Sequence, residues 1–373
     1  MDNPFQFSGV VDDPAFCNRK KETKDLKRYI ETSQNVLLYS HRRYGKSSLL
    51  LKLFKELNTV KPIYVDLYGT TSPAEFISAF LSGLCTLETK IDRLMKLIRN
   101  GIMSINVNFS IDPLSGLPAM SPVFSRGVEN RTIDELFALV ENLSRKIKLV
   151  IAFDEFQEVA GYGEMAFEKQ LRKSIQRHDR ISYIFAGSQR HILIEMFSNN
   201  KRAFYQQATS YPLKKIETGH YVEWIRRLYG LAKRKINDHM IEEIVKRCNN
   251  HPRYIQEFFH EIWTEDEINF EVIDTTERYI ITKRISEFAY TWDTLSLNQK
   301  RTLKLLAGTM GKNIFSADNL ARFSFRSASQ VTAALSKLEK MGVINKNGIW
   351  IIQDPFFEKW LQANISNVRF VNQ

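Results

Sequence analysis

Apolar positions in the first 215 residues follow two patterns that alternate along the chain. Short apolar runs are typical of buried strands, whereas apolar residues spaced by three and four predict helices. Strands are predicted at residues 35–40, 62–69, 148–156 and 181–189, and helices at 16–31, 46–57, 72–84, 132–146 and 168–178. Strands that alternate with helices predict a mainly parallel sheet covered on both faces. Residues 104–125 alternate apolar and polar positions around Pro and Gly, which predicts an inserted hairpin.

After residue 217 the pattern is helical only, up to about residue 288. Beyond it, three short helical segments precede two β-rich pieces around an Asn347-Gly348 turn, the helices falling at 296–311, 316–323 and 327–342. Three helices followed by a hairpin is the order of elements in a winged helix. We therefore predict three domains, at residues 1–213, 214–288 and 289–373.

The composition is that of an ordinary globular protein, with 43% hydrophobic and 25% charged residues. No apolar run approaches the roughly 20 residues that cross a bilayer, and the N-terminus lacks a secretory pattern, so we expect a cytoplasmic protein without a membrane partner. Cys17, Cys85 and Cys248 lie far apart and form no C-x-x-C pair, which favours reduced thiols. A net charge of +11 attracts polyanions but does not choose among nucleic acid, nucleotide and anionic lipid.

The stretch YSHRRYGKSSLL, residues 39–50, comes close to the phosphate-binding loop pattern G-x-x-x-x-G-K-[ST]. Gly45 allows the backbone to approach phosphates, Lys46 reaches the β- and γ-oxygens, and Ser47 offers a hydroxyl to Mg²⁺. Ser40 replaces the first glycine of the pattern. A serine fits at this position if its φ is negative, so the sequence does not decide whether the loop has the usual phosphate-binding geometry. The candidate nucleotide-binding residues are Ser40, His41, Arg42, Arg43, Tyr44, Gly45, Lys46, Ser47 and Ser48.

The stretch LVIAFDEF ends a predicted strand with two acids, as a P-loop ATPase requires. Asp154 would hold Mg²⁺ through water, beside the Ser47 hydroxyl, and Glu155 would polarise the attacking water. Ser188 ends the next predicted strand and would lie beside the two acids, within reach of the γ-phosphate or the water. The candidate catalytic residues are Lys46, Asp154, Glu155 and Ser188.

These motifs, together with VDLYGTTSPAEF, FAGS, NHPRYIQEF and DPFFEKWL, resemble the archaeal-type ATPase family. That family belongs to the STAND class of P-loop NTPases, which is related to AAA+ proteins and Orc1/Cdc6-like initiators. The resemblance spans nearly the whole chain, from FCNRKKE to DPFFEKWL. It implies an α/β fold with an ASCE/AAA+-like parallel sheet, a helical lid domain and a C-terminal winged-helix domain, and it implies ATP or ADP with Mg²⁺ as ligands.

The resemblance also implies roles for residues outside the loop. Phe16, Asn18 and Arg19 match a motif that lies near the adenine, although NRKKE replaces the commoner Gly-Arg-Glu form. His251 and Pro252 match the pair by which the helical lid touches the phosphates. A histidine before a proline at a helix start lies beside helix N–H groups, so His251 either contacts nucleotide or merely caps the helix.

Two further arginine roles are left open by the sequence. Arg253 is a candidate for a sensor-2-like contact or for a solvent-facing position. The sequence does not assign an arginine finger, for which Arg190 and Arg202 are candidates.

The third helix of the predicted winged helix is the one that would enter a major groove. The candidate nucleic-acid residues are Arg326, Ser329, Gln330, Thr332 and Lys337. Such domains also act as protein-docking or autoinhibitory modules in STAND-like proteins, so double-stranded DNA, a protein partner and self-association are alternatives.

The first functional hypothesis is a switch ATPase that binds ATP, hydrolyses it slowly and controls a winged-helix output domain. The second is a DNA-binding initiator or mobile-element helper whose nucleotide state sets its grip on DNA. The third is an ATP-binding interaction scaffold that does not hydrolyse ATP, in which Ser40 marks lost catalysis.

Overall fold

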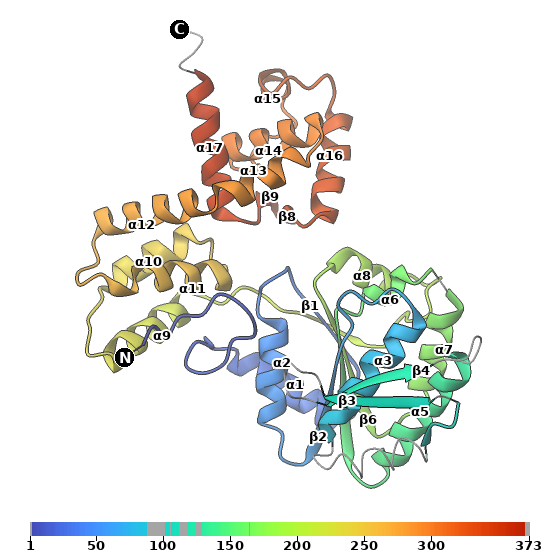
Figure 1. Cartoon of the computed structure of the whole chain (residues 1–373). Coiled ribbons are helices and arrows are strands. Elements are labelled where there is room, and N and C mark those ends of the chain that lie inside the picture. The colour runs from blue at the N-terminus through green and yellow to red at the C-terminus, as the bar shows by residue number, and fades with distance from the viewer. Residues whose placement is uncertain are drawn as a thin grey trace. The chain divides into compact units, whose positions relative to one another are not determined.

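The structure is a computed structural model that describes residues 2–87, 101–104, 106–111, 118–123, 129–163 and 165–369. The chain forms two compact units (Figure 1), one of Arg19–Lys214 and one of Met1–Asn18 with Lys215–Gln373. Within the described ranges, every helix is too short or too polar to span a bilayer. The predicted limits of three domains, 1–213, 214–288 and 289–373, stay predictions.

A five-stranded sheet forms the centre of the Arg19–Lys214 unit (Figure 1). All neighbouring strands are parallel and their order is β2-β5-β6-β1-β7, which confirms the predicted parallel sheet. The strands are β1 (Val36–Tyr39), β2 (Val60–Asp66), β5 (Lys148–Asp154), β6 (Ile181–Gly187) and β7 (Thr209–Pro212). Because β6 lies between β1 and β5, the segments that follow these three strands meet at the same carboxyl edge.

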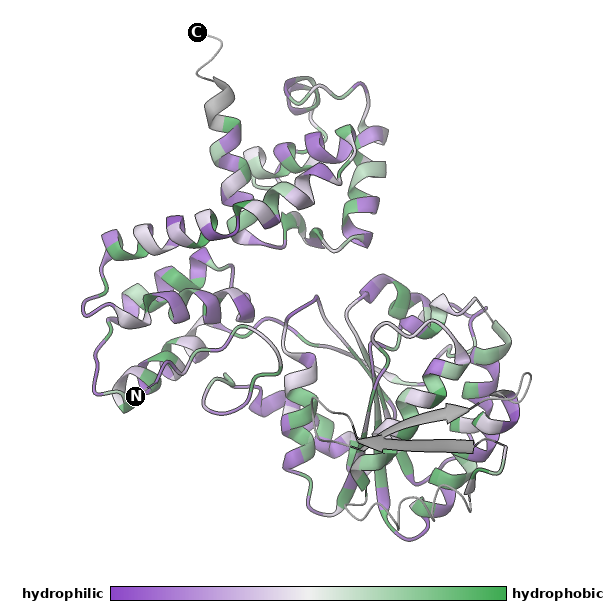
Figure 2. Ribbon diagram, viewed as in Figure 1, coloured by the Kyte–Doolittle hydropathy of each residue, from purple (hydrophilic) through white to green (hydrophobic). Residues whose placement is uncertain are grey.

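Burial explains why four of these strands were predicted and the fifth was not. All seven residues of β6 are buried, and so are six of the seven in β5, because helices cover both faces of the sheet. Figure 2 shows the same strands in the colours of apolar residues. The four residues of β7 are exposed or half-buried, so no apolar run marks this strand.

Helices α3 (Pro73–Leu84), α5 (Glu129–Ser144) and α7 (Met165–Ile175) share one core cluster with the sheet. Phe76, Phe80 and Phe153 meet there with ring centroids 5.4–6.1 Å apart. Helices α1 (Lys20–Glu31) and α2 (Lys46–Lys55) contact one another and the sheet at β6 and β2. The start of α3 follows from its sequence, since the Ser72 hydroxyl accepts from the Glu75 amide and Pro73 occupies the first helical position.

The inserted hairpin is confirmed as a separate antiparallel pair, β3 (Asn106–Ile111) with β4 (Pro118–Val123). Its turn, residues 112–117, lies outside the described residues. The other elements among the described residues of this unit are the short helix α6 (Glu158–Gly161), α8 (Arg190–Ser198) and a 3-10 turn at Cys85–Leu87.

From Lys215 to Arg369, the described part of the second unit is helical except for one hairpin, as the sequence predicts. Its first helices are α9 (Thr218–Leu231), α10 (Asp238–Arg247), α11 (Pro252–Glu261), α12 (Phe270–Lys283) and α13 (Ile285–Asp293), with a 3-10 turn at Ile262–Thr264. The winged-helix elements are α14 (Leu297–Thr309), α15 (Ala317–Arg322), α16 (Ala328–Lys340), β8 (Ile344–Asn347), β9 (Ile349–Ile352) and α17 (Pro355–Arg369). β8 and β9 are antiparallel around Gly348, whose φ of 75° is the left-handed value that glycine supplies.

The N-terminal segment packs on this helical unit. The Phe5 ring lies 5.5 Å from that of Trp224 and 5.3 Å from that of Phe259. Nε2 of Gln256 donates to the carbonyl of Ala15 at 2.5 Å, and Nε1 of Trp224 donates to Pro14 at 3.1 Å.

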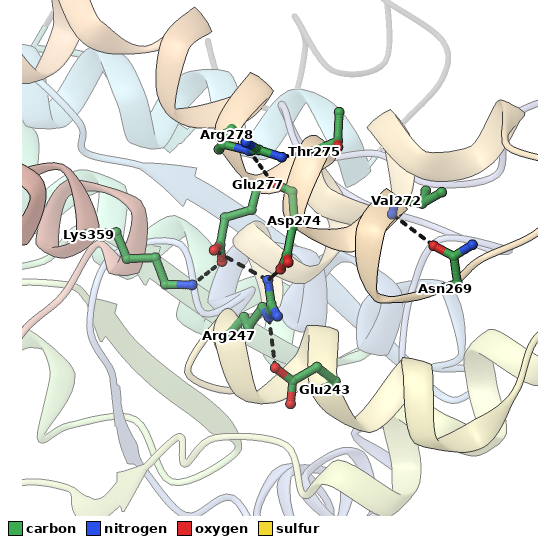
Figure 3. A network of polar contacts seen from close by, with 9 residues as sticks. All are labelled: Glu243, Arg247, Asn269, Val272, Asp274, Thr275, Glu277, Arg278 and Lys359. Atoms are coloured by element: carbon green, nitrogen blue, oxygen red, sulfur yellow. Dashed lines mark hydrogen bonds and ion pairs between the residues drawn. The ribbon is translucent and has the colours of Figure 1, made fainter.

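Two charged networks join the elements of the helical unit. Arg247 on α10 pairs with Glu243, and with Asp274 and Glu277 on α12, while Glu277 also pairs with Lys359 on α17 (Figure 3). The second network centres on Arg284, between α12 and α13, which pairs with Asp354, Glu287 and Glu257. These networks connect α10, α11 and α12 with the C-terminal helix α17.

Candidate nucleotide site

The loop between β1 and α2 has the backbone conformation that its sequence requires. Left-handed φ angles occur at Arg43 (63°) and Gly45 (83°), whereas Ser40 is not among the described residues with positive φ. A Cβ at Gly45 would meet nothing within 4 Å, so glycine is needed there for its backbone angle. Ser40 therefore fits the loop without a glycine, and its hydroxyl donates to the His41 carbonyl at 2.9 Å.

Lys46 places a buried cation at the first turn of α2. The residue is 5% exposed. Burial lowers the pKa of Lys46, while the charges of Glu155 and Asp154 raise it and Arg42 lowers it further. A desolvated ammonium at the positive end of a helix is a site that an anion such as phosphate would occupy.

Asp154 receives hydrogen bonds on both carboxylate oxygens. The hydroxyls of Ser47 and Tyr64 both donate to Oδ2, at 2.5 and 2.6 Å, and the Glu155 amide donates to Oδ1 at 3.0 Å. A hydroxyl and a carboxylate at this separation form an oxygen donor set of the kind that Mg²⁺ prefers. The residues present therefore fit the metal that the fold implies, with Ser47 and Asp154 as the groups that would hold it.

Glu155 follows β5 in a left-handed conformation, with φ of 51°. Its Oε2 accepts from the hydroxyl and the amide of Ser188, at 2.8 and 3.2 Å. The same oxygen accepts from Nε2 of Gln157 at 2.5 Å. Ser188 thus lies beside the acid, as the neighbouring strands β5 and β6 require, while its contact with phosphate or water stays a prediction.

The sequence did not point to Tyr64 or Gln157. Tyr64 stands two residues before Asp66 on β2, and this spacing of two was the available signal, since it puts both side chains on one face of the strand. Gln157 had no signal, because the turn after β5 brings its side chain back to Glu155. Gly187 leaves room for this, since a Cβ there would lie 2.0 Å from Oε1 of Gln157.

The two candidate finger arginines differ in their surroundings. Nη1 of Arg190 donates to Nε2 of His41 in the loop at 2.9 Å. Arg202 pairs with Glu168 at 2.5 Å and with Glu195 at 3.5 Å. Arg190 therefore belongs to the surroundings of the loop, whereas the charge of Arg202 is engaged by carboxylates away from it.

Arg19 lies in the same unit as the loop and contacts its backbone. Nη2 donates to the Tyr44 carbonyl at 3.2 Å, and Nη1 donates to the Lys214 carbonyl at 2.7 Å and to Glu22 at 2.8 Å. Its contact with adenine stays a prediction. Phe16 and Asn18, which the resemblance also assigns to the adenine, belong to the other unit.

His251 and Pro252 also belong to the helical unit. His251 is the N-cap residue of α11 with Pro252 at the first helical position, and its side chain makes no capping hydrogen bond. Its ring lies 4.5 Å from the ring of Tyr254, measured between centroids. Contact of His251 with a nucleotide stays a prediction, and so does a sensor-2-like role for Arg253, whose guanidinium lies over the Tyr254 ring.

Helix α16 presents the candidate nucleic-acid residues. Arg326, Ser329, Thr332 and Lys337 are exposed, whereas Gln330 is half-buried and accepts from the Arg326 amide at 3.0 Å. Binding of DNA through this face stays a prediction.

Comparison with known proteins supports the fold along the whole chain. Residues 286–363 match the family model described as "Probable winged helix domain". The Walker-type ATPase PABY2304 of Pyrococcus abyssi is similar in structure, with a TM-score of 0.67, 19% identity and coverage of 96% of this chain and 99% of that one. The ORC2 protein of Aeropyrum pernix, solved as ADPNP-ADP complexes, has a TM-score of 0.57 and 15% identity over 96% and 98% of the two chains. No curated protein matches the chain in sequence.

This chain has a P-loop ATPase fold with a C-terminal winged helix. The predicted fold class is therefore confirmed, and so is the resemblance to archaeal ATPases of the Orc1/Cdc6-related type, at the level of the fold. In this P-loop ATPase fold, the loop, the two acids and Ser188 occupy the carboxyl edge of the sheet.

Proposed function

We propose that this protein is a switch ATPase of the STAND/AAA+ type, which binds Mg²⁺-ATP and hydrolyses it slowly. One observation carries the proposal, which is that the functional groups gather within one compact unit. The Ser47 hydroxyl donates a hydrogen bond to Asp154 beside the buried Lys46, and the Ser188 hydroxyl donates one to Glu155. A cation, a pair of oxygen ligands for a metal and a candidate base thus lie on consecutive strands of one sheet edge. These are the groups that phosphoryl transfer to water requires.

Each residue has one part in this reaction. Lys46 and the amides at the start of α2 bind and orient the β- and γ-phosphates. Ser47 and Asp154 hold the metal, which neutralises charge on the phosphate oxygens when bound. Glu155 accepts the proton of the attacking water, and Ser188 orients this carboxylate or the γ-phosphate.

The surroundings of Glu155 favour slow turnover. Its Oε2 already accepts three hydrogen bonds, from Ser188 twice and from Gln157. An oxygen that already accepts three hydrogen bonds is poorly placed to accept a proton from an attacking water. Hydrolysis therefore becomes efficient only when a partner, or a second copy of the chain, rearranges these donors.

In this proposal, the helical unit transmits the nucleotide state to the winged helix. His251 is one turn from Tyr254, and the Tyr254 ring packs against Phe356 of α17 at 5.6 Å and under the Arg284 guanidinium at 5.5 Å. A change at the start of α11 would thus act on the same residues that attach the winged helix.

A second candidate function is ATP-controlled binding of double-stranded DNA. The exposed Arg326, Ser329, Thr332 and Lys337 on and before α16 favour it, together with a net charge of +11. A protein partner of the winged helix is the alternative output. The third hypothesis, a scaffold that binds ATP without hydrolysis, no longer draws support from Ser40, whose backbone fits the loop.

The test measures ATP affinity and ATP hydrolysis after bound nucleotide has been removed, with and without duplex DNA. Lys46→Ala is expected to weaken ATP binding by about 100-fold or more, since it removes a charged phosphate ligand. Glu155→Gln is expected to bind ATP within about threefold of the parent and to show no turnover. Lys55→Ala, an exposed lysine on the same helix, is the matched control and should behave as the parent.

The outcomes separate the hypotheses. A parent that binds no ATP contradicts the proposal. ATP binding without hydrolysis under all conditions identifies the scaffold, and turnover by Glu155→Gln equal to the parent removes Glu155 from the mechanism. Stimulation of hydrolysis by DNA, with binding that weakens steeply as salt rises, favours the second candidate.

A further inference from the structure

Tyr64 contacts the Asp154 carboxylate, which is a proposed ligand of the metal. Tyr64 itself lies outside the sequence motifs that predicted the site. Its hydroxyl donates to Oδ2 of Asp154 at 2.6 Å, and Ser47 donates to the same oxygen at 2.5 Å. Asp154 is 2% exposed, so these bonds replace water that this oxygen would otherwise bind. Both donors are neutral, and within the described part of the chain no ion pair involves Asp154.

The position of Tyr64 follows from the register of two strands. Asp66 on β2 is the partner of Asp154 on β5, and Tyr64 lies two residues earlier, beside Ala152. Residues two apart on a strand point to the same face, so Tyr64 and Asp154 share a face of the sheet. The phenol therefore reaches the carboxylate from the edge strand, while Ser47 reaches it from α2.

The two hydroxyls that donate to Asp154 have different roles in the proposed metal site. Ser47 is itself one of the residues that would hold the metal, so its oxygen would be shared between Asp154 and the metal. Tyr64 is not among those residues, so its hydroxyl is free to keep its hydrogen bond to Oδ2. A tyrosine hydroxyl is a hydrogen-bond donor, which suits it to a carboxylate oxygen that can only accept.

We infer that Tyr64 is the positioning residue of the metal site, which fixes the orientation of the Asp154 carboxylate and so sets the Mg²⁺-dependent part of nucleotide affinity. The inference rests on the proposed function. Outer-shell partners of metal ligands commonly change metal affinity by about 10–100-fold, because they fix the direction of the ligand's lone pairs.

The test compares ATP affinity with excess Mg²⁺ and with EDTA, for the parent and for Tyr64→Phe. The variant keeps the ring and loses only the donor. We expect affinity in Mg²⁺ to fall about tenfold, affinity in EDTA to stay within about twofold, and the Mg²⁺ concentration for half-maximal ATP binding to rise about tenfold.

Tyr162→Phe is the matched control. The Tyr162 hydroxyl bonds to that of Thr70 at 2.7 Å, and the residue is buried in the same unit without contacting Asp154. Any loss of stability in this variant measures the cost of removing a buried tyrosine hydroxyl. The variant should leave the ratio of ATP affinities in Mg²⁺ and in EDTA unchanged.

Three results would overturn the inference. Unchanged affinity in both conditions for Tyr64→Phe would give Tyr64 a structural role alone. An equal loss in Mg²⁺ and in EDTA would place its action on the loop instead of the metal site. A parent that binds no ATP in either condition would remove the proposed function and this inference together, whereas a parent that binds with a normal Mg²⁺ effect isolates the contribution of Tyr64.

Discussion

Buried charges are handled differently in the helical unit and at the carboxyl edge of the sheet. In the helical unit, the Arg284 side chain is 7% exposed and pairs with carboxylates of α11, α13 and the start of α17. At the sheet edge, Asp154 and Glu155 accept only from neutral groups and backbone amides, the side-chain donors being Ser47, Tyr64, Gln157 and Ser188. Among the described residues, no ion pair engages either of these two acids.

The pKa shifts follow the same division. The Arg284 guanidinium, mainly through its hydrogen bond, holds the pKa of Glu287 below its usual value, and Arg247 does the same for Glu243. Burial instead lowers the pKa of Lys46 at the sheet edge. Charges held in ion pairs stabilise the fold, whereas a desolvated charge that forms no ion pair among the described residues remains available to a ligand. This contrast separates structural charge from functional charge in this chain.

The largest expected effect comes from breaking the Arg284 network. Arg284→Met should lower the free energy of unfolding by about 3–5 kcal/mol, because Glu257 would stay buried without its cation. All five tryptophans lie at residues 224–360, in the helical unit, so tryptophan fluorescence during urea unfolding reports on that unit alone. Arg278→Met, at an exposed arginine of α12 (Figure 3), should change the value by less than about 0.5 kcal/mol. A loss below about 1 kcal/mol at Arg284 would mean that the network does not stabilise the unit.

The next effect disturbs the neutral donors around Glu155. In Gly187→Ala, the new methyl would meet Oε1 of Gln157 at 2.0 Å and Cδ1 of Leu193 at 2.9 Å, which displaces Gln157 from Glu155. We expect a loss of about 1–2 kcal/mol in stability, followed by far-ultraviolet circular dichroism, and a changed rate of ATP hydrolysis with little change in ATP affinity. Gly161→Ala, where a Cβ meets nothing within 4 Å, is the control. Unchanged stability and turnover would contradict a role for this hydrogen bond.

The carboxyl group of Glu358 should make the stability of the helical unit depend on pH. Burial raises the pKa of Glu358 on α17 to about 7, with Lys359 opposing the shift. The folded state then binds more protons than the unfolded state between about pH 4.5 and 7, so stability is full at low pH and falls as pH rises to 7. Because the side chain is partly exposed, we expect a fall of about 1–2 kcal/mol across this range. In unfolding followed by tryptophan fluorescence, Glu358→Gln should remove this fall in stability. The control Glu339→Gln, on α16, should leave it in place. Parent and Glu358→Gln proteins with parallel pH profiles would refute the assignment.

The smallest expected change in stability has the opposite sign. Lys46→Met removes a buried ammonium that forms no ion pair within the described residues, although the charges of Glu155 and Asp154 act on it. The nucleotide-free protein should therefore be equally stable or more stable by up to about 1 kcal/mol. Thermal unfolding followed by circular dichroism measures this. Mg²⁺-ATP should raise the unfolding temperature of the parent and leave that of the variant unchanged. A destabilised variant would place Lys46 among the structural charges.

Elements whose signals are local could be predicted from the amino-acid sequence. The loop residues, Gly45 to Ser47, and the acids after the third predicted strand are contiguous in sequence, and their strand–loop–helix setting follows from apolar spacing. The Ser72-Pro73 helix start and the Gly348 turn depend on neighbouring residues in the same way. The helical run and the hairpin after it also predicted the winged helix.

Which of these parts meet became clear from the packing of the folded chain. The strand order places β6 beside β5 and so brings Ser188 to Glu155, and strand register brings Tyr64 to Asp154. The same holds for Gln157, for Arg19 on the loop backbone and for the packing of residues 2–18 on the helical unit. Apolar periodicity records which face of an element is buried, but it does not record which element lies next to it. The partners of a polar side chain are therefore set by packing, because long-range contacts leave no regular spacing along the chain.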